Sequence, residues 1–268
     1  MSSTDVDAPR QQGLRVSFDP DNIFTLQPVS SSYPWSEVTV IDEGGRPSIL
    51  TEYGTPWVSK SDGARDLYRG YMEQFTHEGG ERIQALREVA LRWVVGEAQL
   101  DGIANEVRLY EQELVPLQGT VVPKFFGFFK GFVGKNKVGC IVTEWCRGVQ
   151  IGEEHELNRQ RMLSAIELHK AGIYHGRLLD KTHWVSAGDG TLRIVGFSSA
   201  HIHDCEGMTV LSKDTGGDPR PDAVCKELAV LESRFGVDAE RDGNYVRWAN
   251  NMYPDFDTSF YLVYSFPS

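Results

Sequence analysis

The sequence LHKAGIYHGRLLDKTHWVSAGDGTLRIVGFSSA, residues 168–200, decides the expected fold. Apolar residues precede it at roughly helical spacing, and Gly172 marks the expected end of that helix. The run AGDG at residues 187–190 is typical of a hairpin turn, and its flanks predict strands at residues 183–185 and 192–195. The stretch therefore predicts a helix, a polar loop and a short β-hairpin, in that order.

The loop and the segment after the hairpin resemble two motifs of the protein-kinase family. Protein kinases carry His-Arg-Asp-Leu-x-x-x-Asn on a catalytic loop and Asp-Phe-Gly on a metal-binding loop. The corresponding runs here are HGRLLDKT at residues 175–182 and GFS at residues 196–198. With His-Gly at the head of the loop and LQG at residues 117–119, the chain looks most like the diverged kinase-like proteins of filamentous fungi.

The resemblance implies that the chemical residues of a kinase are replaced. The catalytic base falls on Arg177, the metal-binding Asn on Thr182 and the metal-binding Asp on Gly196. Arginine cannot accept a proton at neutral pH, and phosphoryl transfer depends on metal ions held by carboxylate or amide oxygens. We therefore expect no ordinary kinase activity, no bound metal and no cofactor.

A charged pair upstream is also implied by the resemblance. The run VALR at residues 89–92 stands where kinases have Val-Ala-Ile-Lys, so Arg92 takes the place of the phosphate-binding lysine. Glu106, in an amphipathic helix predicted from residue 103 to about residue 114, matches the glutamate that pairs with that lysine. Arginine holds a carboxylate in a planar fork and keeps its charge, so we predict a structural Arg92–Glu106 ion pair.

The same resemblance gives Thr143 the gatekeeper position and Glu144, Trp145 and Cys146 the hinge. The kinase hinge binds adenine through its main chain, so changed side chains do not abolish a slot for a flat heterocycle. Trp145 can equally serve only packing, and both interpretations stay open. The expected ligand-binding residues of a cleft between two lobes are Arg92, Glu106, Thr143, Glu144, Trp145, Cys146, Thr182 and Gly196.

Four residues of the loop region are the candidate catalytic residues: His175, Arg177, Asp180 and His183. Arg177, together with Arg92, could hold a carboxylate or phosphate group of a small ligand without metal. A nearby histidine or aspartate could then move protons. Asp180 could also supply a carboxylate to an atypical kinase, or it is only a turn residue.

A His-x-His run, His201 and His203, has a spacing seen at metal sites, because residues i and i+2 of a strand face the same side. A zinc site there would need a third ligand such as His175, Asp204 or Cys205. In the kinase frame the loop histidine is structural and packs against a neighbouring phenylalanine. We predict no metal site, and whether the His201–His203 run binds metal stays open.

The composition indicates a soluble, intracellular protein. The 268 residues, 40% of them hydrophobic, suit one compact unit of two lobes. A net charge of -11 without a basic stripe argues against a nucleic-acid partner. The four cysteines form no CxxC pair, and no apolar run predicts a signal peptide or a membrane span. We expect a cytoplasmic protein with reduced thiols and no membrane partner.

The predicted fold is α+β, a protein-kinase-like two-lobe fold with a β-rich small lobe and a shortened, mainly helical large lobe. The expected parts are a disordered N-terminus (1–13), an N-terminal extension with the small lobe (14–146) and the large lobe (147–268). The expected function is that of a pseudokinase, a ligand-binding or scaffolding module with a small molecule in the interlobe cleft or a protein as its partner. The alternative is an enzyme of isomerase, lyase or cyclase type that acts on a small metabolite without ATP or metal, and a third possibility is an atypical kinase that uses Asp180.

Overall fold

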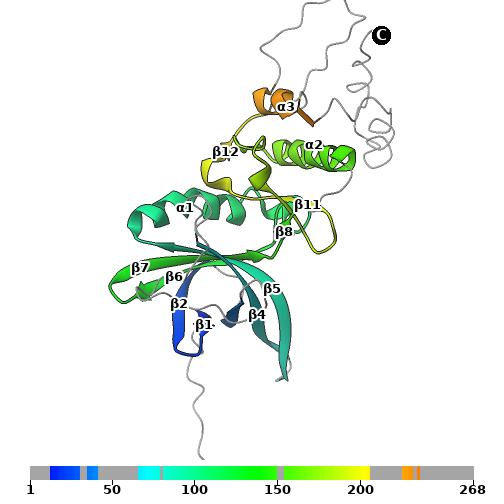
Figure 1. Cartoon of the computed structure of the whole chain (residues 1–268). Helices are drawn as coiled ribbons and strands as arrows, with labels where there is room; N and C mark the ends of the chain where they lie inside the picture. The colour runs from blue at the N-terminus through cyan, green and yellow to red at the C-terminus, as the bar shows by residue number, and fades with distance from the viewer. Residues whose placement is uncertain are drawn as a thin grey trace, which may run out of the picture. The chain divides into compact units, whose positions relative to one another are not determined.

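A computed structural model describes residues 13–30, 35–41, 66–78, 81–149, 154–205, 225–231 and 234–235 (Figure 1). The chain divides into two compact units. The barrel unit consists of Met1–Val107 and Lys124–Trp145, and the C-terminal unit consists of Arg108–Pro123 and Cys146–Ser268. The predicted disorder of residues 1–13 lies outside the described residues, except for Gly13.

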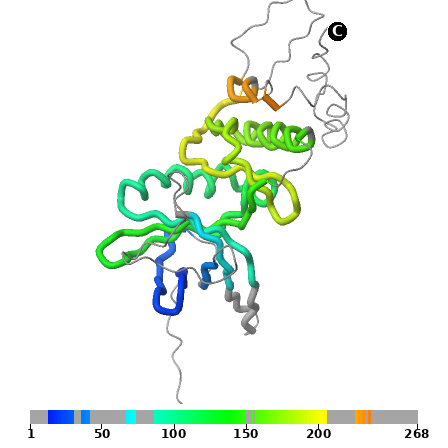
Figure 2. Tube along the Cα trace, in the orientation of Figure 1, coloured from blue at the N-terminus to red at the C-terminus, as the bar shows by residue number. Residues whose placement is uncertain are grey.

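The barrel unit is a closed ring of seven strands in the order β1-β2-β6-β7-β5-β4-β3 (Figure 1). Every neighbouring pair is antiparallel except β1 and β3, whose parallel pairing closes the ring. In the Cα trace, β6 and β7 form one continuous hairpin (Figure 2). The strands are β1 (Gly13–Asp19), β2 (Asn22–Ser30), β3 (Trp35–Ile41), β4 (Asp66–Glu78), β5 (Glu81–Val95), β6 (Phe125–Val133) and β7 (Asn136–Glu144).

Alternating side chains fill the inside of the barrel. On β1, Leu14, Val16 and Phe18 are fully buried and alternate with residues that are more exposed, as the two-residue period of a strand requires. The ring of Phe18 meets Tyr68 and Trp93 edge-on, with ring centroids 5.2 and 5.3 Å apart. Edge-to-face aromatic contacts of this kind add to the stabilisation from burial alone.

Helix α1 (Glu97–Glu111) covers part of the outer face of the barrel. Within the barrel unit, Leu100, Ile103 and Val107 of this helix share a buried cluster with side chains of β5, β6 and β7. The side chain of Leu100 occupies the space that a Cβ atom on Gly139 of β7 would need. The glycine therefore allows α1 to lie directly on the sheet. The contact between Arg92 of β5 and Glu106 of α1 belongs to the same helix–sheet interface.

The C-terminal unit contains residues 168–200, for which a helix, a polar loop and a short β-hairpin are predicted. The predicted helix is α2 (Glu154–Lys170), and Gly172 follows it with a φ of 77°, which confirms the expected helix end. The predicted hairpin is also confirmed, because β10 pairs with β11 in antiparallel fashion. The other elements are η1 (Val115–Leu117), β8 (Arg147–Gly148), β9 (Ile173–Tyr174), η2 (Lys181–His183), β10 (Trp184–Ser186), β11 (Leu192–Ile194), η3 (Phe197–Ser199), β12 (His201–Ile202) and α3 (Lys226–Leu231).

The predicted kinase-like fold is wrong. The described residues are mostly β, with a closed seven-stranded barrel and only three α-helices, whereas a two-lobe kinase fold needs a helical large lobe. The parallel pairing of β1 with β3 closes the sheet and removes the edges that an open sheet would leave. After residue 171 the described chain forms one α-helix, of six residues. None of the described helices combines the length and apolarity needed to cross a bilayer.

Candidate functional site

The predicted site residues fall into two groups, one in each unit. The barrel unit holds Arg92, Glu106, Thr143, Glu144 and Trp145. The C-terminal unit holds Cys146, His175, Arg177, Asp180, Thr182, His183 and Gly196.

The Arg92–Glu106 ion pair is confirmed. Arg92 Nη1 of β5 donates a hydrogen bond to Glu106 Oε2 of α1, and the two side chains are only 12% and 6% exposed. The pairing uses a single nitrogen of the guanidinium and not the two-pronged fork that was expected. The other two nitrogens, Nε and Nη2, are buried and have no hydrogen-bond partner within the described residues. Arg92 therefore keeps unused donors beside its carboxylate partner.

The hinge residues Glu144 and Trp145 are engaged within the barrel unit. The main-chain N–H of Glu144 donates to Lys124 O at 2.8 Å, and that of Trp145 donates to Glu88 O at 3.3 Å. The guanidinium of Arg69 lies over the Trp145 ring, 5.4 Å from its centroid. These contacts favour the packing role for Trp145. The main-chain N–H groups of Glu144 and Trp145 already have acceptors, and the Trp145 ring already has a cation on its face.

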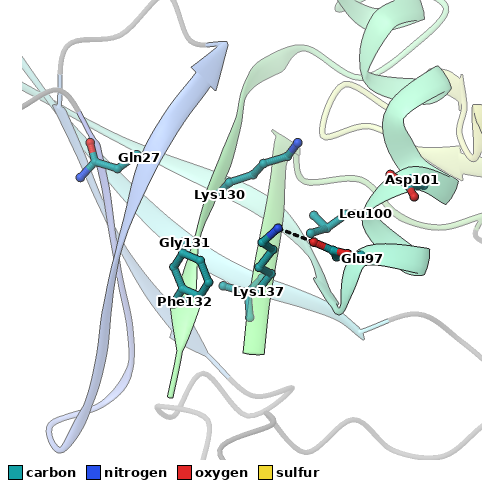
Figure 3. A pocket seen from close by; sticks show the side chains of 9 residues that line it. Gln27, Glu97, Leu100, Asp101, Lys130, Gly131, Phe132 and Lys137 are labelled. Carbon is teal, nitrogen blue, oxygen red and sulfur yellow. Dashed lines mark hydrogen bonds and ion pairs between the residues drawn. The ribbon is translucent and has the colours of Figure 1, made fainter. Parts of the chain in front are cut away.

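A pocket of about 620 Å³ lies on the barrel unit beside the start of α1 (Figure 3). Lys137 in this pocket pairs with Glu97, and their hydrogen bond raises the pKa of Lys137 and lowers the pKa of Glu97. The pocket lining contains two amines, of Lys130 and Lys137, and two carboxylates, of Glu97 and Asp101. The lining therefore has no net charge that would favour an anionic or a cationic ligand. The lining residues are Gln27, Glu97, Leu100, Asp101, Lys130, Gly131, Phe132, Lys137 and Val138.

Two histidines of the loop region share one acceptor. His175 Nε2 and His183 Nδ1 lie 3.2 and 2.8 Å from the carbonyl oxygen of Val195. A carbonyl only accepts, so each of these nitrogens carries a proton. Gly196 has a φ of 84°, and a Cβ atom there would lie 2.7 Å from His183 Nδ1. The glycine is therefore required for the approach of His183.

His175 serves the structure of the loop. The residue is 0% exposed, and its ring packs against Phe197 with centroids 5.0 Å apart, as the resemblance had implied. Burial, and secondarily the charge of His183, lower the pKa of His175 from 6.5 to about 4. The imidazole is therefore neutral at physiological pH.

The remaining loop residues do not form a catalytic cluster. Asp180 caps η2 by accepting a hydrogen bond from the Thr182 main-chain N–H at 2.9 Å, and this bond lowers the pKa of the Asp180 carboxyl. The observed role of Asp180 is therefore that of a turn residue. Arg177 and Thr182 are exposed, and Cys146 is partly buried.

Glu227 of α3 is a buried anchor that sequence analysis missed. Its carboxylate accepts hydrogen bonds from His169 Nε2 at 3.0 Å, from the His175 main-chain N–H at 2.9 Å and from the Gly176 main-chain N–H at 2.6 Å. Burial alone would raise the pKa of Glu227, but these three donors together lower it. Glu227 lies 52 positions after His175, and a single glutamate carries no local signal of such a role.

The His201–His203 run does not act as a pair. The exposed His201 ring stacks on Tyr174 with centroids 4.9 Å apart, whereas His203 lies in a group with His169, Cys205 and Cys225. Of the third ligands considered for this run, only Cys205 belongs to that group. His203 therefore belongs to a cluster of four possible metal ligands and not to a pair with His201.

A comparison with protein-family models finds none that matches this sequence, and a search of curated proteins finds no similar one. The resemblance of the loop to kinase motifs therefore stays a prediction.

Breaking the Arg92–Glu106 pair should destabilise the barrel unit. The substitution Arg92→Met leaves the buried Glu106 carboxylate without its cation, which should cost about 3–5 kcal/mol of unfolding free energy in a urea titration. The matched double variant Arg92→Met/Glu106→Leu should recover most of this loss, because it removes both charges. An unchanged unfolding free energy in Arg92→Met would contradict the structural role of the pair.

The stability of the C-terminal unit should depend on pH through His175. Its pKa is about 4 in the folded protein and 6.5 without burial, so between these values the unfolded chain binds a proton that the folded chain does not. The free energy of unfolding is therefore highest above pH 6.5, and it falls as the pH is lowered towards 4. Between pH 7 and 4.5 the loss should be about 2–3 kcal/mol.

The matched measurement uses His175→Gln, which does not titrate but can still donate to Val195 O. Urea unfolding at several pH values should show a weaker pH dependence in this variant than in the wild type, and all other titrating groups cancel in the comparison. Equal pH dependence in the two proteins would show that His175 is not responsible.

Proposed function

We propose that this protein is a non-catalytic binding module that holds an anionic group of a small ligand at Arg92 and does not transfer phosphate. The observation that carries this proposal is the pair of buried, unpartnered nitrogens of Arg92 within the described residues. A scaffolding role is compatible with the same site, since a bound ligand would stabilise the folded barrel unit.

Arg92 is suited to an anionic ligand by its remaining donors. A buried donor without an acceptor costs about 1–3 kcal/mol, so a ligand oxygen that accepts from Nε or Nη2 would remove this cost. The planar guanidinium presents these donors in the geometry of a carboxylate or phosphate. Glu106 neutralises the arginine, so affinity would come from directed hydrogen bonds and not from net charge.

The hydrogen bonds of the carboxylates around the loop support the proposal that this protein does not transfer phosphate. Catalysis of that reaction needs carboxylate or amide oxygens that hold metal ions on the phosphates. Asp180 accepts from Thr182, Asp189 accepts from Thr191, and Glu227 accepts from three donors of its own unit. These carboxylates already serve the folding of their own turns and loop.

The binding role can be tested with inorganic phosphate as the probe. At ten times its dissociation constant, phosphate should stabilise the wild type by about 1.4 kcal/mol, a rise in melting temperature of about 3–6 °C. Arg92→Lys keeps a cation beside Glu106 but lacks the spare guanidinium donors, so it should lose this rise.

Arg15→Lys is the control for this experiment. Arg15 is an exposed arginine of the same unit that pairs with Glu37 at 3.8 Å, and its replacement should leave the phosphate effect intact. Chloride at equal ionic strength corrects for general salt effects. The proposal fails if the wild type shows no rise beyond chloride, or if both arginine variants keep the rise.

The absence of phosphoryl transfer can be tested with ATP. Any shift in melting temperature that ATP causes should be the same with and without Mg²⁺, because the loop carboxylates are engaged in other hydrogen bonds. Intact-mass measurement after incubation with ATP and Mg²⁺ should show no added phosphate. A shift that requires Mg²⁺, or a phosphorylated chain, would contradict this part of the proposal.

A further inference from the structure

Four side chains of the C-terminal unit gather their nitrogen and sulfur atoms at one point. They are His169 at the end of α2, His203 and Cys205 just after β12, and Cys225 immediately before α3. One potential ligand atom of each lies within 4.8 Å of all the others. Cys225 and His169 are 56 positions apart in the sequence, so the fold, and not local chain geometry, assembles the cluster.

The distances within the cluster match a tetrahedral zinc site. The Sγ atoms of Cys205 and Cys225 both lie 3.4 Å from His169 Nδ1. Zinc bonds of about 2.3 Å to sulfur and about 2.0–2.1 Å to nitrogen give tetrahedral N–S and S–S separations of about 3.6 and 3.8 Å. A contraction of about 1 Å at the longest separation would therefore complete the coordination sphere.

Glu227 fixes His169 in the form that binds a metal. The carboxylate lies 3.0 Å from His169 Nε2 and can only accept, so Nε2 carries the proton and the lone pair of Nδ1 points towards the two sulfurs. His169 is 2% exposed and Glu227 is 7% exposed, so water does not compete for this bond. A carboxylate behind a ligating histidine is a regular feature of zinc sites.

His203 provides an independent indication of a missing partner. Its Nε2 atom is buried and has no hydrogen-bond partner in the part of the chain that the structure describes. The His203 ring packs edge-on against the His169 ring, with centroids 5.6 Å apart. A buried imidazole nitrogen without a partner is costly, and a bond from a ring nitrogen to a metal ion would account for the position of this residue.

We infer that His169, His203, Cys205 and Cys225 bind one Zn²⁺ ion in a closed, tetrahedral, structural site, and that Glu227 orients His169. Two sulfurs and two imidazoles select zinc over the hard cations Mg²⁺ and Ca²⁺. Four protein ligands leave no open position, so the ion would not be catalytic. This inference does not depend on anion binding at Arg92.

The proposed ion would link the end of α2, the segment after β12 and the start of α3. Glu227, which orients His169, also accepts hydrogen bonds from the His175 and Gly176 main chain, so the metal site and the loop share one anchor. Metal binding to residues far apart in sequence is coupled to folding, because the unfolded chain has no preformed site. Zinc would therefore stabilise the fold of this unit.

The first experiment measures metal in the full-length protein, expressed without an affinity tag and purified under reducing conditions. Mass spectrometry of the metal content should find one zinc per chain. Replacement by Co²⁺ should give thiolate-to-cobalt charge-transfer absorption and the strong visible bands of tetrahedral cobalt. A chelator should lower the melting temperature, and added Zn²⁺ but not Mg²⁺ should restore it.

The second experiment uses matched cysteine variants. Cys225→Ser should lose the bound zinc and the cobalt bands, whereas Cys146→Ser, outside the cluster but in the same unit, should keep both. Glu227→Gln should still bind one zinc, with an affinity lowered about 10–100-fold because the oriented charge behind His169 is lost.

Several results would overturn the inference. Wild-type protein that holds no zinc and shows no thiolate–cobalt band would exclude the site, whatever the stability of the variants. Equal zinc content in Cys225→Ser and the wild type would exclude the assigned ligands. A Cys205–Cys225 disulfide in protein kept under reducing conditions would assign the cluster to redox chemistry instead.

Discussion

A closed ring with an odd number of strands cannot alternate direction all the way round. The seven-stranded barrel meets this constraint with one parallel pair, β1 with β3, and all its other pairs are antiparallel. Closure gives every strand of the barrel a hydrogen-bonded neighbour on both sides, and it encloses the aromatic cluster around Phe18. The outer face is then available to α1, and this is where Arg92 meets Glu106.

The C-terminal unit depends on a different kind of constraint. Its strands are only two or three residues long, and the buried carboxylate of Glu227 accepts from His169 of α2 and from the main chain of His175 and Gly176 in the loop. Buried carboxylates are tolerated only when such donors compensate for the loss of water. The polar groups of the loop therefore form hydrogen bonds within the folded unit. This explains why His175 and Asp180, which were expected to be catalytic, instead stabilise the loop and its turn.

Local signals were predictable and pairings over long range were not. Gly172 and the AGDG turn act within a few residues, so they correctly indicated a helix end and a hairpin. Arg92 and Glu106 were paired through a motif resemblance whose fold proved wrong, yet the contact holds because a β5 residue and an α1 residue still face each other. The closure of β1 on β3 has no sequence signal, since an alternating strand looks the same in an open sheet and in a barrel. Glu227 and Cys225 were missed because their partners lie far away in the chain.

The pairing of β2 with β6 sets the order in which the barrel can be made. On the side away from β1, Asn22–Ser30 pairs with Phe125–Val133, so a growing polypeptide cannot complete the ring until β6 and β7 have left the ribosome. Until then the edges of β2 and β5 that later pair with β6 and β7 have no partner in the sheet. Synthesis of this protein therefore includes an interval in which its first strands must be kept from associating with other nascent chains, and the arrival of β6 and β7 ends that interval.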